Sequence, residues 1–223
     1  GVEVRRPDPR TWRVEPQTYR AADLAIEPDA SAASYVFAAA AVLGGRATVI
    51  GLGDASLQGD LSFVDVLGEM GATVDRTATT TTVTGTGTLR GIEVDMRQLS
   101  DTAPTLAVVA AFAEGPSRVT GIGFTRGKET DRVGNVVAEL RRLGIDAIEE
   151  PDGFTVGPRP MRAATIQTYD DHRMAMAFAL AGLRFDGVQI ADPAVVAKTF
   201  PGYWHLLDEL RAPSHTGAMV RTP

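Results

Sequence analysis

Residues 169–180 read YDDHRMAMAFAL, a stretch in which a polar cluster runs directly into an apolar segment. The segment from Met174 to Leu180 carries no charged side chain, which is typical of a helix buried on all sides. The residues just before it, Asp170 to Arg173, are two acids, a histidine and an arginine. This order indicates a helix whose start faces a site and whose remainder lies in the core.

The same plan occurs three times along the chain. Each copy has a polar start, an Ala-rich apolar helix that ends near glycine, a short strand, a polar loop and an amphipathic helix. The apolar helices read AASYVFAAAAVLGG after Ser31, TAPTLAVVAAFAEG after Asp101 and HRMAMAFALAGLRFDG after Asp171. Asp101 and Asp171 are 70 residues apart, and the same interval of 70 separates Gln58, Lys128 and Lys198. We therefore predict a repeat of structural units.

Short strands follow the second helix in the first two copies, so the unit reads β-α-β-α-β-β. Because the first helix of each unit is apolar all round, it should be buried. We predict an α/β lobe of three such units around a pseudo-threefold axis, with buried helices inside and sheets outside. In this prediction the lobe spans residues 26–212, and residues 213–223 form a loose tail. Residues 1–25 are polar and extended, with one or two strands and no helix.

Composition limits the class of protein. The 223 residues are 44% hydrophobic and carry a net charge of -6, which argues mildly against a nucleic-acid or anionic-membrane surface. No cysteine is present for a disulfide or a thiolate nucleophile, and three widely spaced histidines show no metal-ligand pattern. The longest apolar runs are too short to span a bilayer, and no signal peptide is visible. We expect a cytoplasmic protein that needs no metal.

Polar residues recur at two places in each unit, the start of the buried helix and the loop before the amphipathic helix. Since repeated positions are equivalent in space, these places should converge at one end of the lobe. Helix starts expose unpaired N–H groups and favour anions. Four cations would join them there, namely Lys128, Arg132, Arg173 and Lys198. We predict a site for a highly charged anion with phosphate or carboxylate groups.

Each of these residues also has a purely structural interpretation. Asp101 and Asp171 are suited to cap their helices, and the run from Lys128 to Arg132 is suited to a solvated charged surface. His172 and Lys198 could be ordinary capping-region and surface side chains. The shared repeat positions favour a site, because independent coincidences at one end of one lobe are improbable.

At these residues the chain resembles a known family. The strings EPDASAASY (27–35), QGD (58–60), RGKETDR (126–132), YDDHRMAMAFAL (169–180) and AKTFPGYW (197–204) occur in the order found in the C-terminal half of 5-enolpyruvylshikimate-3-phosphate synthases. The resemblance runs from about Leu24 to Leu210. It implies an enolpyruvyl transferase-like lobe of the repeated kind predicted above.

The resemblance also implies a reaction and its residues. Family members transfer the enolpyruvyl group of phosphoenolpyruvate to the 5-hydroxyl of shikimate 3-phosphate and release phosphate, in the shikimate pathway to chorismate and the aromatic amino acids. By resemblance, Arg132, Arg173 and Lys198 bind phosphoenolpyruvate. Asp101 and Lys128 contact shikimate 3-phosphate, and His172 lines the pocket. Asp101 and Glu129 are the implied catalytic proton-transfer groups, with no cofactor.

Residue chemistry agrees with this reaction. Proton transfer to a methylene carbon and from a hydroxyl needs acid–base groups, which two carboxylates can be. A departing phosphate needs cations around it. One position differs from the family pattern, because Phe124 stands where many members have a polar residue that touches the shikimate ring.

The resemblance implies that the chain is about half of an enzyme. The first lobe of the family is largely absent, and residues 1–25 look like its last strand and the crossover. We expect a folded chain that is nearly inactive without the N-terminal lobe as its partner. Two alternatives stay open: a non-catalytic lobe that binds anions or a partner protein, and a sister enolpyruvyl transferase that uses a nucleotide sugar. The Asp171-His172-Arg173-Met174 string disfavours the second alternative.

Overall fold

Helices and strands alternate along the part of the chain that the computed structural model describes, residues 1–211 and 218–220. The helices are α1 (Ala30–Leu43), α2 (Phe63–Glu69), α3 (Ala103–Ala110), α4 (Gly134–Arg142), α5 (His172–Ala179) and α6 (Tyr203–Arg211). Shorter 3-10 turns are η1 (Gly59–Ser62), η2 (Ser100–Thr102), η3 (Gly123–Gly127), η4 (Leu180–Leu183) and η5 (Pro193–Lys198). The strands are β1 (Arg5–Asp8), β2 (Thr11–Arg13), β3 (Arg46–Ile50), β4 (Thr73–Arg76), β5 (Thr80–Thr84), β6 (Glu93–Asp95), β7 (Ser117–Thr120), β8 (Asp146–Glu150), β9 (Gly153–Gly157), β10 (Ala164–Ile166), β11 (Val188–Ile190) and β12 (Ala218–Val220).

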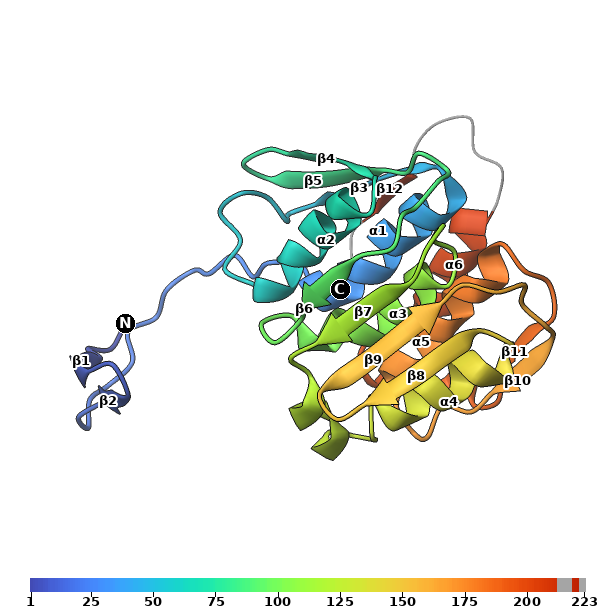
Figure 1. Cartoon of the computed structure of the whole chain (residues 1–223). Helices are drawn as coiled ribbons and strands as arrows, with labels where there is room; N and C mark the ends of the chain where they lie inside the picture. Colours follow the sequence, from blue (N-terminus) through green and yellow to red (C-terminus); the bar gives the residue numbers. More distant parts are fainter. Residues whose placement is uncertain (212–217, 221–223) are drawn as a thin grey trace.

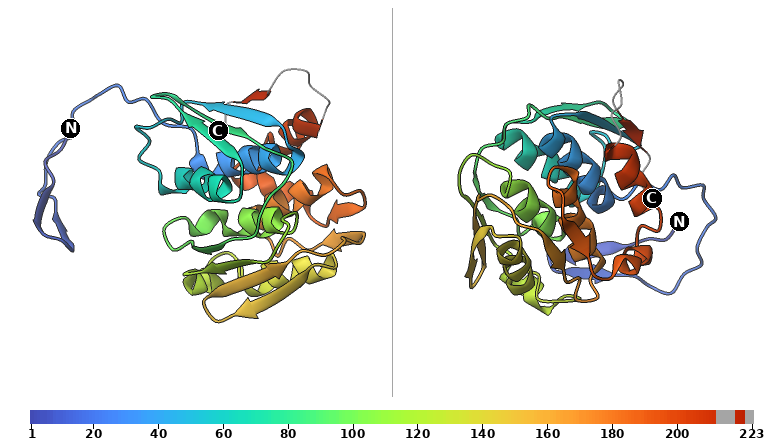
Figure 2. Two further views of the ribbon diagram at one scale, coloured as in Figure 1. Left: turned by 45° about the horizontal axis from the view of Figure 1, so that its top comes forward. Right: turned by 90° about the vertical axis from the view of Figure 1, so that its right-hand side faces the viewer.

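Three helices, α1, α3 and α5, form the interior of the lobe. α3 contacts both α1 and α5, and the strands lie on the outside of these helices (Figure 2). Every residue of α3 is buried, and in α5 every residue except Arg173 is buried. The many alanines of α1 and α3 have short side chains, so the helices can approach one another closely and exclude water. The predicted buried helices are confirmed.

The amphipathic helix α4 packs one of its faces against this interior. α4 buries Val136, Val137 and Leu140, while the arginines of its last turn, Arg141 and Arg142, are directed outward. The 3.6-residue period of the apolar positions predicts this pattern, with Glu139 facing outward beside the two arginines. The prediction is wrong for Glu139, whose side chain is 0% exposed because it accepts hydrogen bonds from Tyr169, Gln167 and Arg142.

Two four-stranded sheets form the outer faces of the first two units, with strand orders β12-β3-β5-β4 and β6-β7-β9-β8 (Figure 1). In both sheets the first pair of strands is parallel and the remaining pairs are antiparallel. β3 pairs with β5 from Arg46↔Thr84 to Ile50↔Thr80, in a register that turns Ala47 and Val49 into the core.

β7 and β9 approach closely at Gly153. A Cβ atom at this position would lie 1.9 Å from the carbonyl oxygen of Val119. The pairing of these two strands therefore requires glycine.

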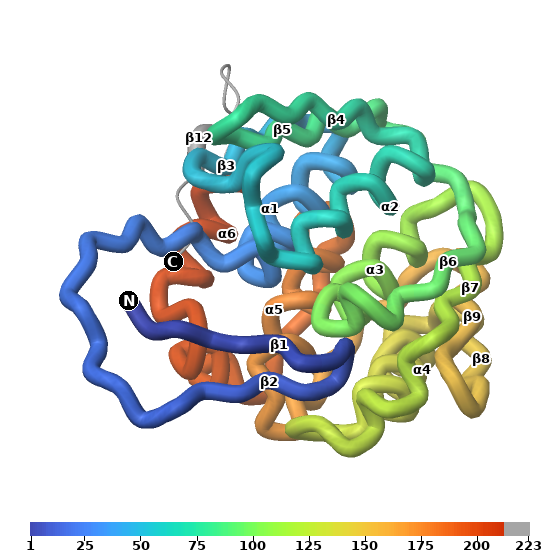
Figure 3. The backbone as a smooth tube through the Cα atoms, turned by 90° about the vertical axis from the view of Figure 1, so that its left-hand side faces the viewer, coloured from blue at the N-terminus to red at the C-terminus, as the bar shows by residue number. Residues whose placement is uncertain are grey.

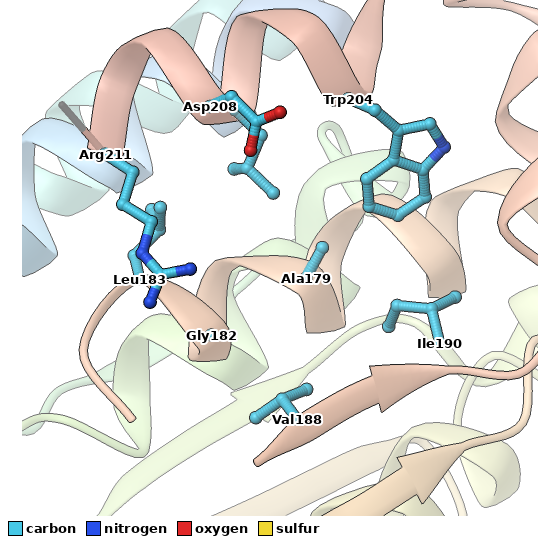
Figure 4. Close-up of a pocket in the computed structure, with 9 residues that line it drawn as sticks. Ala179, Gly182, Leu183, Val188, Ile190, Trp204, Asp208 and Arg211 are labelled. Carbon is cyan, nitrogen blue, oxygen red and sulfur yellow. The ribbon is translucent and has the colours of Figure 1, made fainter. Parts of the chain in front are cut away.

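The third unit has a shorter sheet. β10 and β11 are parallel and flank α5 in the chain, as β6 and β7 flank α3. Within the described residues no antiparallel pair of strands adds to β11. The β-α-β-α-β-β order is continuous along the chain in the second unit, and in the first unit β12 pairs with β3 as β6 pairs with β7. Beside β11 lies a pocket with apolar side chains, lined by Ala179, Gly182, Leu183, Val188, Ile190, Trp204, Leu207, Asp208 and Arg211 (Figure 4).

Residues 1–29 form an arm that leaves the lobe where α1 begins. Its two strands, β1 and β2, pair as a small antiparallel hairpin that stands apart from the lobe (Figure 1). The arm contains no helix, as predicted, and its apolar Leu24 and Ile26 are 78% and 84% exposed. The arm therefore contributes little to the packing of the lobe.

The C-terminal region is described in part. The predicted loose tail, residues 213–223, lies outside the described residues except for β12, which pairs in parallel with β3. Across the described ranges, no helix is long and apolar enough to cross a membrane.

Candidate active site

The starts of the three buried helices lie at the end of the lobe that Figure 3 faces, and each start is built differently. Asp171 is the N-cap of α5, and its carboxylate accepts a hydrogen bond of 2.8 Å from the amide of Arg173. Asp29 caps α1 by accepting from the amide of Ala32 at 3.0 Å. Asp101 does not cap α3, because it lies inside the 3-10 turn η2 that precedes this helix.

Asp101 is the meeting point of three predicted cations. Its Oδ1 accepts from Lys128 and, at 3.0 Å, from the guanidinium of Arg132. Its Oδ2 accepts from Arg173 at 3.0 Å. The three cations come from two different units, so a single carboxylate joins the second unit to the third.

Glu129 holds the fourth cation. Its two carboxylate oxygens accept from Lys198 Nζ at 3.1 Å and from Arg132 at 2.8 Å. Lys198 ends the turn η5, and Glu129 lies in the loop before α4. All four predicted cations thus lie in one ion-pair network, as the repeat spacing predicted.

Arg132 lies at the centre of this network and is the most deeply buried of the four cations. Its side chain is 3% exposed and pairs with Asp171, which is 0% exposed, through contacts of 2.7 and 3.2 Å. Asp171 therefore has a second function besides the cap. A charged group so deeply buried needs such partners, because desolvation strongly disfavours an isolated charge.

The pKa values of two network carboxylates, Asp101 and Glu129, are lowered by their surroundings. Partial burial acts to raise the pKa of Asp101, but the hydrogen bond from Lys128 and the charges of Arg173, Lys128 and Arg132 outweigh it and lower the pKa. The pKa of Glu129 is lowered to about 2, first by its own backbone N–H and then by Lys198. The network thus pairs four cations with three carboxylates, those of Asp101, Glu129 and Asp171.

His172 borders the network as a buried side chain. It is 3% exposed, and its Nδ1 lies 3.7 Å from a carboxylate oxygen of Asp171, too far for a hydrogen bond. Burial lowers the pKa of His172, and the charge of Arg173 lowers it further. Nδ1 is buried and has no hydrogen-bond partner among the described residues.

The first unit contributes neutral and acidic groups instead of cations. Gln58, at the repeat position of Lys128 and Lys198, accepts a hydrogen bond from the amide of Ala30 at 2.8 Å and so completes the start of α1. Next to it, Ser31 donates to Asp60. Burial raises the pKa of Asp60, and the nearby charge of Asp101 raises it further. The repeat pattern includes Ser31, Gln58 and Asp60 but does not indicate a role for them.

Phe124 lies beside the network and is exposed. Its ring centroid is 5.8 Å from Lys128 Nζ, within the range of a cation–π contact, and 57% of the residue is accessible. A pocket at the edge of the network is lined by two of its members, Glu129 and Lys198, and by Asp170, Ala194 and Val195. No group of three or more His, Asp or Glu side chains suited to a metal occurs in the described part of the chain.

The arrangement is suited to an anion that carries several charges. Such a ligand can take over the hydrogen-bond donors of Arg132, Arg173 and Lys198 from the carboxylates that now hold them. Two carboxylates would then remain next to the bound anion, in positions suited to proton transfer. The sequence indicated all of these groups but not the pairing between Arg132 and Asp171.

Sequence comparison finds one family over most of the chain. The family model described as EPSP synthase (3-phosphoshikimate 1-carboxyvinyltransferase) matches residues 1–207. A 3-phosphoshikimate 1-carboxyvinyltransferase of Nostoc punctiforme is 47% identical over 92% of this chain, and one of Methanoculleus marisnigri is 45% identical over 93%. The chain covers 48% and 49% of these two proteins, so it spans about half the length of the curated relatives it matches.

Solved structures share the fold. An EPSP synthase from Acinetobacter baumannii aligns with a TM-score of 0.81 and 27% identity, covering 94% of this chain and 52% of that one. The enolpyruvyl transferase NikO from Streptomyces tendae aligns with a TM-score of 0.74 at 23% identity, over 98% of this chain and 52% of that one. The second likeness shows the fold alone.

Proposed function

The chain belongs to the EPSP synthase family, and from this premise we propose that it forms the C-terminal lobe of an enolpyruvyl transferase. The proposed enzyme moves the enolpyruvyl group of phosphoenolpyruvate to the 5-hydroxyl of shikimate 3-phosphate and releases phosphate. One observation carries the proposal: four cations from two units meet in a single network at the starts of the buried helices.

In the proposal, Arg132, Arg173 and Lys198 bind phosphoenolpyruvate. Arg132 and Arg173 offer planar guanidinium groups that match a carboxylate or phosphate, and Lys198 supplies a compact charge. The side chain of Lys198 is 54% exposed, so it can turn from Glu129 to the ligand at little cost. Lys128 contacts shikimate 3-phosphate together with Asp101, and His172 lines the pocket.

Glu129 and Asp101 carry the proton transfers in the proposal. A proton added to the methylene carbon makes C2 of phosphoenolpyruvate cationic, the 5-hydroxyl oxygen attacks C2, and the hydroxyl proton is taken up. Elimination then returns a proton from the methyl group and breaks the C–O bond to phosphate. Once the ligand takes Lys198 and Arg132, the pKa of Glu129 should rise from about 2 toward its ordinary range, where it can exchange a proton.

The substrates need a second lobe facing this one. The exposed arm leaves the lobe at the start of α1, close to Ser31 and Asp60 at the edge of the network. We propose that residues 1–25 are the last part of the N-terminal lobe and the crossover from it, and that residues 26–212 are the C-terminal lobe. The isolated chain should be folded but nearly inactive. A cytoplasmic location stays a prediction from the sequence.

Reconstitution tests the proposal. The chain is mixed with a separately produced N-terminal half of a relative, and phosphate release is measured with both substrates. We expect turnover from the mixture and almost none from either half. Glu129→Gln should reduce turnover about 100-fold or more, whereas Glu149→Gln should leave it unchanged. Glu149 is a matched control, because it also pairs with an arginine, Arg126, but lies outside the network.

Three results would contradict parts of the proposal. Strong turnover by the chain alone would show that one lobe suffices. Equal activity of the Glu129→Gln and Glu149→Gln variants would exclude a catalytic role of Glu129. Calorimetric binding of phosphoenolpyruvate without turnover in any mixture would favour the alternative, a lobe that binds anions without catalysis.

A further inference from the structure

The turn before α5 has an unusual backbone. Asp171 N–H donates to the carbonyl of Thr168 at 2.9 Å, and the two residues between them have positive φ angles, 53° at Tyr169 and 57° at Asp170. This is the geometry of a type I′ turn, which glycine, asparagine and aspartate favour at both central positions. Tyrosine is not among these residues. The chain therefore holds strained backbone immediately before a residue of the candidate site.

A buried carboxylate outside the network holds this turn. Glu139 of α4 has a side chain that is 0% exposed. Its Oε1 accepts from the Tyr169 hydroxyl at 2.7 Å, and its Oε2 accepts from the amide of Gln167 at 3.0 Å and from Arg142 at 2.9 Å. Glu139 thus bonds to the residue before the turn and to its first central residue. The proposed reaction makes no use of this carboxylate.

Helix α4 with its preceding loop and the 167–173 segment are joined a second time, at the candidate site. Arg132 precedes α4 and pairs with Asp171, the last residue of the turn. Glu139 lies seven residues after Arg132, about two helical turns further along. The contact between α4 and the 167–173 segment is therefore fixed at two points, one inside the network and one behind it.

We propose that Glu139 and Tyr169 are positioning residues that hold the strained turn, so that Asp171 keeps the Arg132 guanidinium in the orientation that binds phosphoenolpyruvate. They act through Asp171 and touch no substrate. This inference rests on the proposed role of Arg132, and it adds two residues that the repeat pattern and the family motifs leave without a function.

Amide hydrogen exchange tests, without any ligand, whether Glu139 and Tyr169 stabilise the turn. In Tyr169→Phe and Glu139→Gln variants of the chain, exchange at Asp171 and Arg173 should become at least tenfold faster, with α1 unchanged. Tyr19→Phe, at an exposed position of the arm, and Glu149→Gln are the matched controls. Unchanged exchange at Asp171 would overturn the proposal.

Kinetics of the reconstituted enzyme test the link to the anion. Tyr169→Phe should raise the KM for phosphoenolpyruvate about fivefold or more and change the KM for shikimate 3-phosphate less than twofold. Tyr169→Gly should be milder than Tyr169→Phe, because glycine adopts positive φ without strain and needs no hydroxyl to hold it. Equal changes in both KM values, or a glycine variant worse than phenylalanine, would overturn the proposal. A wild-type chain that binds no phosphoenolpyruvate would overturn the proposed function instead, and the exchange rates would still report on the turn.

Discussion

Replacing Asp171 by asparagine removes one charge from the most buried ion pair of the network and leaves its shape intact. Asparagine caps helices as well as aspartate does, so the bond to the Arg173 amide is kept and the loss reports on the charge. Removing one partner of a buried pair typically costs about 3–5 kcal/mol. The variant leaves Arg132 with two other carboxylate partners, Asp101 at 3.0 Å and Glu129 at 2.8 Å, which are 31% and 35% exposed and compensate its charge in part. We therefore expect the lower end of the range, about 3 kcal/mol.

Urea unfolding followed by circular dichroism measures this loss. For a chain of this size, 3 kcal/mol corresponds to a Tm lower by roughly 6–12 °C. Asp192→Asn is the matched control, because Asp192 caps η5 at the surface through the amide of Ala194. It should change the free energy of unfolding by less than about 0.5 kcal/mol. If Asp171→Asn costs no more than the control, Asp101 and Glu129 alone compensate Arg132, and the reasoning about the buried pair is wrong.

Two further predictions concern the core and the pH dependence. Gly153→Ala should lower the free energy of unfolding by about 3 kcal/mol, because the added Cβ atom would collide with the carbonyl of Val119. In the same urea assay the control Gly45→Ala, whose added Cβ would meet no atom within 4 Å, should change this free energy by less than about 0.5 kcal/mol. Equal losses in the two variants would contradict the close approach of β7 and β9. The pKa of His172 is lower in the folded protein than its ordinary value of 6.5, so the unfolded chain binds a proton first as the pH falls. At pH values under about 6.5 the free energy of unfolding should therefore decrease by up to about 1.4 kcal/mol per pH unit. His172→Asn should flatten this slope between pH 6.5 and 5, and an unchanged slope would show that other groups cause it.

Periodicity along the chain was sufficient to predict the interior and the members of the site. The apolar helices could be recognised because each is free of charges over more than two turns. The four cations could be grouped because residues 70 apart hold equivalent places in repeated units. Both inferences depend on local pattern and repetition, which a sequence displays directly.

Pairing across units could not be predicted in the same way. Arg132 and Asp171 are 39 residues apart, and the cap at Asp171 already accounted for that carboxylate. Asp101 was an equally good N-cap candidate, but a 3-10 turn before α3 directs it to the cations instead. At Tyr169 the positive φ angle carries no sequence signal, because tyrosine does not favour this conformation and tertiary contacts impose the turn.

The ion pairs of the network span long stretches of chain, and this bears on how the protein folds. Arg173 and Asp101 are 72 residues apart, and Lys198 and Glu129 are 69 residues apart. Such distant contacts pay the entropy of loop closure before they gain energy, so they form late. A nascent chain with only its first two units in place lacks α5 from its interior, and it lacks Arg173 and Lys198 from the network. The anion site proposed above is therefore complete only when the last unit has docked, so ligand binding by this lobe should be a measure of completed folding.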